Sequence, residues 1–205
     1  MKSAGKIINL KIEVNLIKEN EINKHTKKEY EQVFSNNEIT ITKVSDPYGW
    51  LSCMSAHPVS YKGNNFRTVE ALFQWLRFQN FPNVQKVIID QKSPMGAKMK
   101  ARKNRELLNR EIKWDEHPDD LPLMKMCLEL KIDQHPQLKA ELLNTGNAVI
   151  IEDCTTHDRE SARFWGMVKK DGQWIGDNEL GKLWMEIRDN LSKNNSVKSV
   201  TNSIQ

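Results

Sequence analysis

The segment of residues 68–78, with the sequence TVEALFQWLRF, constrains the fold more than any other part of the chain. Read at 3.6 residues per turn, its interior polar residues Glu70, Gln74 and Arg77 fall on one narrow line, and every other direction is apolar. A helix of this kind is buried on most of its sides, and Thr68 is placed to cap its start. The polar line faces water, a structural partner or a substrate, and the sequence leaves these alternatives open.

The composition indicates a globular protein with a sizeable core. The chain has 205 residues, of which 38% are hydrophobic and 28% charged, and its net charge of +4 is too weak by itself to indicate a nucleic-acid partner. No segment is apolar over the length of a signal peptide or a membrane span. Cys53, Cys127 and Cys154 are an odd number without C-x-x-C spacing, so we expect reduced thiols. The sequence therefore predicts a cytoplasmic protein with no membrane partner, no metal site and no cofactor.

Hydrophobic periodicity predicts mostly helices, together with a few short strands. Period-two alternation predicts a strand at 38–44, and a short apolar run predicts another at 148–151. The stretch 58–66 reads as a hairpin that turns at 62–65. Ser93 and the following Pro94 are typical of a helix start. Further helices are predicted at 121–134, 137–146 and about 178–191. The fold class expected is a predominantly helical α+β single domain.

The chain divides by composition into three parts. Residues 1–36 read as an N-terminal extension, and residues 37–191 carry the predicted domain. Residues 192–205 are mostly polar, and we expect a disordered tail.

Two acidic positions are candidates for chemistry. Glu70 is either a first-turn carboxylate that favours the helix dipole and pairs with its neighbours, or a carboxylate presented from a rigid, mostly buried helix for acid–base or charge-stabilising work. Glu152 and Asp153 follow an apolar strand that would fix their direction. The alternative is an exposed strand end where both charges meet water.

Aromatic and basic residues could bind a phosphorylated, ring-containing ligand. Trp75 and Trp184 occupy helical core positions, whereas Trp114 and Trp165 lie in connecting segments, where the ring either packs or stacks on a heterocyclic base. Residues 92–113 hold eight Lys or Arg and two Glu, a net charge of +6 against −2 for the rest of the chain. This stretch, with Lys98, Arg102 and Arg105 on one face, is either a solvated surface or a phosphate clamp.

The order and spacing of several motifs resemble the NADAR (NAD and ADP-ribose) family, the YbiA-like N-glycosidases. The resemblance runs from about residue 40 to residue 191. The motifs that carry it are DPYGWLSCMSAHPV, YKGNNFRTVEALFQWLRF, SPMGAKMKARK, LELKIDQHPQLKAELLNTG, IIEDCTTHD, FWG and IGDNELGKLWMEIRDNL.

The resemblance implies hydrolysis of an N-glycosidic bond between a ribose and a base-like amine. Activities in this family include cleavage of phosphoribosylated amino-pyrimidine intermediates of riboflavin synthesis and removal of ADP-ribose from modified guanine. The implied partner is thus a phosphorylated ribosyl substrate, either a nucleotide or ADP-ribosylated nucleic acid. The family's T-x-E-h-x-F-Q glutamate maps onto Glu70, its strand-end glutamate onto Glu152, and its lysine in the LKxxQHP helix onto Lys131, which makes these three the catalytic candidates. The substrate-binding candidates are Trp50, Ser52, Gln74, Lys98, Arg102, Trp114, Asp153, Trp165, Gly166 and Asn178.

The chain departs from the family pattern at three places. It has S-C-M at 52–54 where the family commonly has S-N-F, and Ala71 where many members carry a histidine after the glutamate. Most members place an aspartate three residues before the Trp-Gly pair, where this chain has Ala162. Asp158 and Glu160 are candidates for the missing acidic role.

Bond chemistry then suggests roles. Breaking a ribosyl C–N bond gives an oxocarbenium-like transition state that an ionised carboxylate stabilises, while a second carboxyl can act as acid or base. Glu70 is expected in one of these roles, and Glu152 or Asp153 in the other. Lys131 could instead attack C1 as an amine if burial lowers its pKa. The alternative from another class is a non-catalytic module that binds ADP-ribose or nucleic acid.

Overall fold

The computed structural model describes residues 37–108 and 119–202. The chain divides into two units, Met1–Glu38 and Ile39–Gln205, and the architecture below belongs to the second unit. The predicted N-terminal extension, residues 1–36, lies outside the described residues, and so does Trp114.

The predicted α+β class, predominantly helical with a few short strands, is confirmed. The helices in the described residues are α2 Val69–Leu76, α3 Pro82–Ile89, α4 Pro94–Lys103, α5 Asp120–Gln134, α6 Pro136–Asn144, α7 Glu160–Trp165 and α8 Glu179–Asn202. The strands are β1 Glu38–Ile41, β2 Val59–Tyr61, β3 Asn64–Phe66, β4 Val149–Glu152, β5 Val168–Lys170 and β6 Gln173–Ile175. Short 3₁₀ turns are η1 Gly49–Leu51, η2 Arg105–Leu108 and η3 Thr155–His157.

The strands described here form three two-stranded sheets, β1–β4, β2–β3 and β5–β6. The predicted hairpin is β2–β3, an antiparallel pair in which Val59 faces Phe66 and Tyr61 faces Asn64. Its turn is tighter than expected. Lys62 and Gly63 both have positive φ, 47° and 76°, the backbone that a two-residue hairpin turn requires and that glycine adopts without strain.

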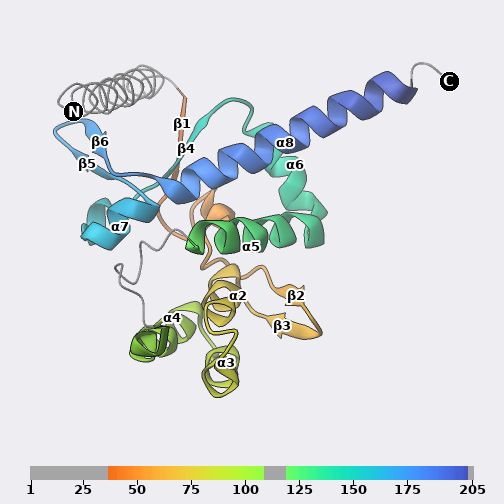
Figure 1. Ribbon diagram of the computed structural model, residues 1–205. Coiled ribbons are helices and arrows are strands. Elements are labelled where there is room, and N and C mark those ends of the chain that lie inside the picture. Colours follow the sequence, from red (N-terminus) through yellow and green to blue (C-terminus); the bar gives the residue numbers. More distant parts are fainter. Residues whose placement is uncertain (1–36, 109–118, 203–205) are drawn as a thin grey trace, which may run out of the picture. The chain divides into compact units, whose positions relative to one another are not determined.

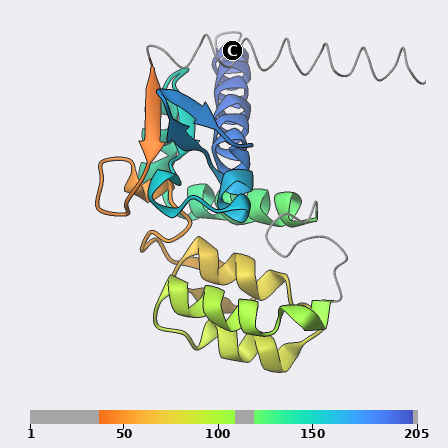
Figure 2. The ribbon, with the colours of Figure 1, turned by 90° about the vertical axis from the view of Figure 1, so that its left-hand side faces the viewer.

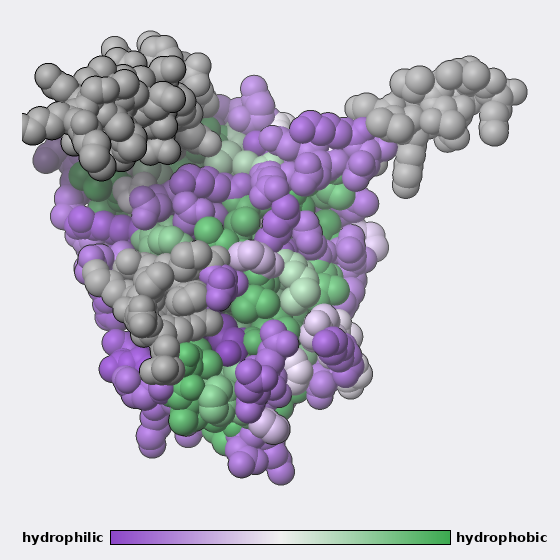
Figure 3. Space-filling model, viewed as in Figure 1, coloured by the Kyte–Doolittle hydropathy of each residue, from purple (hydrophilic) through white to green (hydrophobic). Residues whose placement is uncertain are grey.

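The helices lie on two sides of α5. Helices α2, α3 and α4 pack against one another, and α5 lies on α2 (Figures 1 and 2). On the other side, α8 crosses β4 and contacts α5, α6 and α7 (Figure 1). The core between these elements is apolar, and Leu51, Leu72, Leu128 and Trp184 are fully buried in it. In the space-filling view, hydrophilic residues cover much of the visible face and hydrophobic residues show between them (Figure 3).

Both predicted helix caps are present. Thr68 Oγ1 accepts a hydrogen bond of 3.2 Å from the backbone N–H of Ala71, and Ser93 Oγ accepts one of 3.0 Å from Gly96. Each bond satisfies one of the backbone donors that a helix start leaves without an intrahelical partner. The cap at Thr68 therefore fixes where α2 begins and places Glu70 in its first turn.

The predicted disordered tail, residues 192–205, overlaps the end of the last helix. The backbone of α8 continues to Asn202, well past Leu191, where the apolar stripe ends. The polar residues that follow contain no proline or glycine to stop the helix, and helix propagation costs far less than nucleation. None of the helices in the described ranges combines the length and the apolar character needed to cross a membrane.

Candidate active site

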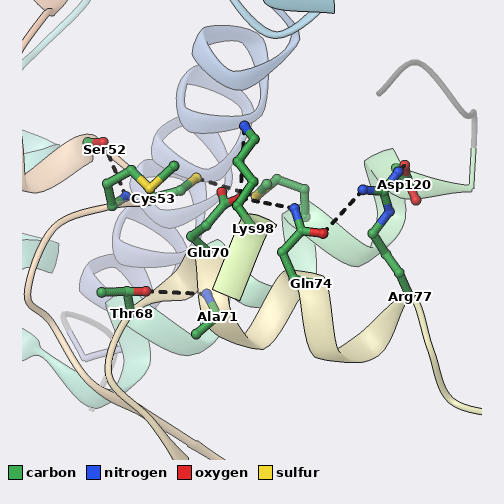
Figure 4. A network of polar contacts seen from close by, with 11 residues as sticks. Ser52, Cys53, Thr68, Glu70, Ala71, Gln74, Arg77, Lys98 and Asp120 are labelled. Carbon is green, nitrogen blue, oxygen red and sulfur yellow. Dashed lines mark hydrogen bonds and ion pairs between the residues drawn. The ribbon is translucent and has the colours of Figure 1, made fainter. Parts of the chain in front are cut away.

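Glu70 faces the protein interior. Only 4% of the residue is exposed, and its backbone N–H donates to the Cys53 carbonyl oxygen at 3.0 Å. Its carboxylate oxygen Oε1 accepts a hydrogen bond of 2.9 Å from Gln74 Nε2, one turn further along α2. The polar line of α2 therefore faces other protein groups and not bulk water (Figure 4).

Lys98 reaches Glu70 from a different helix. Its Nζ lies 3.9 Å from Glu70 Oε1, and its side chain, 39% exposed, extends from α4 towards the carboxylate (Figure 4). An ion pair at this distance between a half-exposed and a buried group is weak in energy but places positive charge at the site. Lys98 was predicted to bind phosphate, and its exposed part remains accessible for that role.

The backbone around Glu152 is held from several directions. Its N–H donates to Asn178 Oδ1 at 3.1 Å, and its carbonyl accepts from the Met167 N–H at 2.8 Å. The next two residues are also tied, because Asp153 N donates to Ile41 O at 3.0 Å and Cys154 N to Met167 O at 2.8 Å. The end of β4 is thus a rigid platform for the Glu152 side chain, as the sequence predicts for a carboxyl at a strand end.

The Glu152 carboxyl lies in an environment that disfavours its charge. Burial raises the pKa of Glu152 from 4.5 to about 8, Lys98 opposes this rise, and the charges of Glu70 and Asp153 add to it. The residue as a whole is half-buried, yet Oε2 is enclosed and has no hydrogen-bond partner among the described residues. A buried polar atom without a partner is uncommon in proteins, and a catalytic role is one of the explanations for it.

Trp165 packs against α2, and Gly166 packs against the end of β4. The half-buried Trp165 ring packs edge-to-face on Phe73 of α2, with ring centroids 5.8 Å apart. Gly166 lies so close to the Glu152 carbonyl and to Cys154 Sγ that a Cβ atom would collide with both. Trp165 therefore combines packing with partial exposure, and Gly166 allows its segment to approach the end of β4.

Asn178 and Asp153 are engaged with backbone. Asn178 is buried, and besides accepting from Glu152 N its Nδ2 donates to Ile150 O at 2.8 Å. Asp153 Oδ1 accepts from Thr155 N at 2.9 Å. Both were predicted to bind substrate. In the contacts described here, Asn178 holds the backbone of β4, and Asp153 stabilises the turn that follows the strand.

Lys131 joins α5 to the segment around η1. It is fully buried, and its Nζ donates to the Trp50 carbonyl oxygen, to Ser52 O at 3.2 Å and to Ser55 Oγ at 2.7 Å. Burial lowers the pKa of Lys131 from 10.5 to about 8, and the charge of Cys53 opposes this shift. These contacts give Lys131 a structural role, because they hold the η1 segment to α5. The lowered pKa is also the property that a nucleophilic amine needs.

The remaining residues predicted from the sequence have contacts of their own, away from Glu70 and Glu152. Trp50 is buried edge-to-face against Trp184, with ring centroids 6.1 Å apart, and Ser52 Oγ accepts from Met54 N at 3.2 Å. Arg102 lies exposed on α4, one turn beyond Lys98. Trp75, predicted in the core, is half-buried and packs edge-to-face on Phe66.

The two candidates for the missing acidic role differ from the carboxyls above. Asp158 forms a bidentate pair with Arg163, at 2.7 and 2.8 Å, and also contacts Lys170 Nζ at 2.9 Å. Hydrogen bonds from Arg163 and Lys170 hold the pKa of Asp158 well below its usual range. Glu160 is exposed in the first turn of α7. Neither carboxyl is enclosed as Glu152 Oε2 is.

Two important features lacked a sequence signal. Arg77 Nη2 forms a buried ion pair with Asp120 Oδ2 at 2.7 Å, and Cys53 places its carbonyl on the N–H of Glu70. The polar line of α2 marks Arg77, but no local pattern pairs it with a residue 43 positions away. The described residues contain no group of three or more His, Cys, Asp or Glu side chains able to hold a metal ion.

Two hollows are lined by described residues near these segments. One of about 640 Å³ lies beside Trp50, Ser55 and His57, and one of about 720 Å³ lies beside Arg77, Phe81 and neighbouring residues. Neither is lined by Glu70 or Glu152. The two carboxyls are therefore distinguished by burial, charge and the partnerless oxygen, and they lie outside the linings of these two hollows.

Sequence and structure comparisons place the chain among known proteins. It is 30% identical over 162 residues to N-glycosidase YbiA of Escherichia coli (strain K12), covering 79% of this chain and 93% of that protein. It is 26% identical over 151 residues to an N-glycosidase of Nostoc punctiforme, covering 73% and 89%. The NMR structure of the E. coli protein YbiA matches with a TM-score of 0.56 and 28% identity, over 80% of this chain and 93% of that chain.

The model of the NADAR domain matches residues 26–192, which includes every described residue named above as a site candidate and begins inside the predicted N-terminal extension. The relatives and the fold agree with this match and with the motifs quoted from the sequence. The chain therefore belongs to the NADAR domain family and is an enzyme of the N-glycosidase class.

Proposed function

We propose that this enzyme hydrolyses the C–N bond between a phosphorylated ribose and a base-like amine. The substrates in view are an ADP-ribosylated guanine and a phosphoribosylated amino-pyrimidine of the riboflavin pathway. The observation that carries the proposal is a pair of carboxyls in unlike environments: Glu70 accepts a hydrogen bond and adjoins Lys98, while Glu152 has a pKa of about 8 and an enclosed, partnerless Oε2. Most glycoside hydrolases use two carboxyls, of which one is protonated and acts as the acid while the other is ionised.

The roles follow from the protonation states. At neutral pH, Glu152 is protonated and donates its proton to the departing nitrogen as the C1–N bond breaks and its electron pair moves to nitrogen. The Glu70 carboxylate stabilises the positive charge that develops at C1 and the ring oxygen. Water then adds to C1, and its proton returns to the ionised Glu152, which restores the starting state.

Binding would come from the groups around the carboxyls. Lys98 is half-exposed beside Glu70, and Arg102 follows one turn later on α4, so both are candidates for the phosphate groups. Trp165 is the described ring best placed to stack on the base or the ribose, because it lies on Phe73, three residues from Glu70.

Lys131 is the alternative nucleophile at C1. Attack by its amine would require release from its three oxygen acceptors. Reduction with cyanoborohydride during turnover separates the two routes. A stable ribosyl adduct on Lys131, found by mass spectrometry of peptides, would assign the attack to the amine, and unmodified Lys131 with full turnover would assign it to water.

The test of the function is direct. The protein is incubated with an ADP-ribosylated guanine oligonucleotide and, separately, with a phosphoribosylated amino-pyrimidine, and the released sugar and base are quantified. Release that Glu70→Gln abolishes and Glu129→Gln preserves would support the proposal, since Glu129 is an exposed carboxylate on α5. No release from either substrate would sink it.

One observation favours a second candidate function, that of a non-catalytic module that binds ADP-ribose or nucleic acid. The family's aspartate before the Trp-Gly pair is Ala162 here, and the nearby Asp158 is neutralised by Arg163 and Lys170. A chain that had lost turnover would still bind the oligonucleotide without releasing ADP-ribose, and salt would weaken that binding steeply.

A further inference from the structure

Four buried polar side chains form a line from the start of α5 to Glu70. Asp120 Oδ2 contacts Arg77 Nη2 at 2.7 Å, Arg77 Nη1 donates to Gln74 Oε1 at 3.3 Å, and Gln74 Nε2 donates to Glu70 Oε1 at 2.9 Å (Figure 4). Each of the four residues is no more than 6% exposed. The polar line of α2 thus faces a structural partner inside the protein, the carboxylate of Asp120.

The line has a fixed direction. A guanidinium group can only donate hydrogen bonds, so Gln74 must turn its carbonyl oxygen to Arg77. Its amide nitrogen then points at Glu70 and has only donors to offer there. Glu70 Oε1 must accept, which a carboxylate does without restriction. Asp120 holds the Arg77 guanidinium in place by their ion pair.

Fold stability alone is a weak reason for this arrangement. Replacing a buried ion pair by apolar residues of similar volume is often neutral or stabilising, and α2 is apolar in every other direction. Arg77 also lies over the Phe73 ring, 5.2 Å from its centroid, and Phe73 supports Trp165. The same line of side chains is therefore joined to both the carboxylate and the ring of the candidate site.

The other charged or titratable groups around Glu70 do not fix its hydrogen-bonding state. Lys98 on α4 is 3.9 Å away and 39% exposed. Glu152 on β4 acts through its charge, and the Cys53 and Cys127 thiols, from the η1 segment and α5, are buried groups whose pKa is raised. Gln74 is the group with a short, buried hydrogen bond to the carboxylate.

We propose that Asp120, Arg77 and Gln74 are positioning residues that keep Glu70 in the hydrogen-bond-accepting form and orientation required at C1. This inference rests on the proposed function and adds to it the roles of three residues other than Glu70 and Glu152. It makes the amide of Gln74 an interior support of Glu70, where the sequence predicted a substrate contact.

The decisive variant is Gln74→Glu. An ionised side chain at this position still accepts from Arg77 but cannot donate to Glu70, and two adjoining carboxylates then compete for one proton. Donation to Glu70 returns only when that shared proton is bound. We expect kcat to fall at least about tenfold relative to wild type between pH 6 and pH 8, with little change in KM, and to recover towards pH 5. Gln74→Met should be impaired at every pH.

Two controls separate positioning from folding. Gln137→Glu introduces the same change on the exposed surface of α6 and should keep the wild-type pH profile. Asp120→Asn should lower kcat in the wild-type background, but add almost nothing to Gln74→Met, because the line is already broken. A pH profile of Gln74→Glu that parallels wild type, or additive effects of Asp120→Asn and Gln74→Met, would overturn the inference.

A measurement without substrate keeps the inference testable if turnover fails. The melting temperature of Gln74→Glu, relative to that of wild type, should rise as the pH is lowered from 8 to 5, since the shared proton is bound more tightly in the folded state. Wild type without turnover would overturn the proposed function alone, whereas equal pH dependence of the two melting temperatures would overturn the positioning role.

Discussion

Lys98 Nζ lies 3.9 Å from Glu70 Oε1 and also lowers the pKa of Glu152, so one partly exposed ammonium group interacts with two carboxyls from different elements. Glu70 comes from the first turn of α2 and Glu152 from the end of β4, 82 positions later in the chain. The charge of Glu70 disfavours ionisation of Glu152, and Lys98 offsets part of this repulsion.

Glu70→Gln should lower turnover by at least about two orders of magnitude, because the amide keeps the shape but removes the charge that stabilises C1. Single-turnover release of the base measures the effect, and circular dichroism checks that the fold is kept. Glu129→Gln on the exposed side of α5 is the matched control. Near-normal turnover of Glu70→Gln would remove Glu70 from catalysis.

Glu152 should make stability depend on pH. Its pKa rises from 4.5 to about 8 on folding, so between these values the folded chain holds a proton that the unfolded chain has released. The stabilisation is fully present below pH 4.5 and lost as the pH rises through 8. Urea unfolding from pH 5 to pH 8 should show the free energy of unfolding of wild type falling by up to about 1.4 kcal/mol per pH unit more than that of Glu152→Gln. Parallel curves for the two proteins would contradict this prediction.

Lys98→Gln should move the alkaline limb of the activity profile to higher pH, because Lys98 holds the pKa of Glu152 below the value that burial alone would give. The general acid would then stay protonated to higher pH. The KM for a phosphorylated substrate should rise as well if Lys98 contacts phosphate. Lys100→Gln, an exposed neighbour on α4, is the control, and an unchanged limb in Lys98→Gln would show that its charge does not act on the acid.

Asn178→Gly should destabilise the fold by about 1–3 kcal/mol, because the Glu152 N–H and the Ile150 carbonyl both lose a buried partner. Asn178→Ala should cost more, since φ at this position is 55°, where alanine is strained and glycine is not. Urea denaturation measures both. If Asn178→Ala were no less stable than Asn178→Gly, backbone conformation would not be the reason for asparagine at this position.

Local chemistry was readable from the sequence. The apolar surround and the polar line predicted a buried helix, and Thr68 and Ser93 marked two helix starts. The apolar run 148–151 marked a strand followed by the carboxyls of Glu152 and Asp153. These features depend on neighbours within a few residues, so a single sequence carries them. Helix α8 runs into the predicted tail as far as Asn202, because low apolar content argues against a packed segment but not against a helix that is already nucleated.

Only the tertiary structure decided which side chains meet. Asp120 with Arg77, Lys98 with Glu70, and Asn178 with the end of β4 are contacts between segments 26 to 43 residues apart, and no local pattern specifies such pairs. The difference between the two carboxyls likewise arises from enclosure by α2, α4, β4 and the segment around Gly166. The sequence determined that an acidic group would lie on a buried helix. Folding determined its hydrogen-bond donor and its neighbouring charges, because burial and electrostatic interactions depend on distances in space and not on separation along the chain.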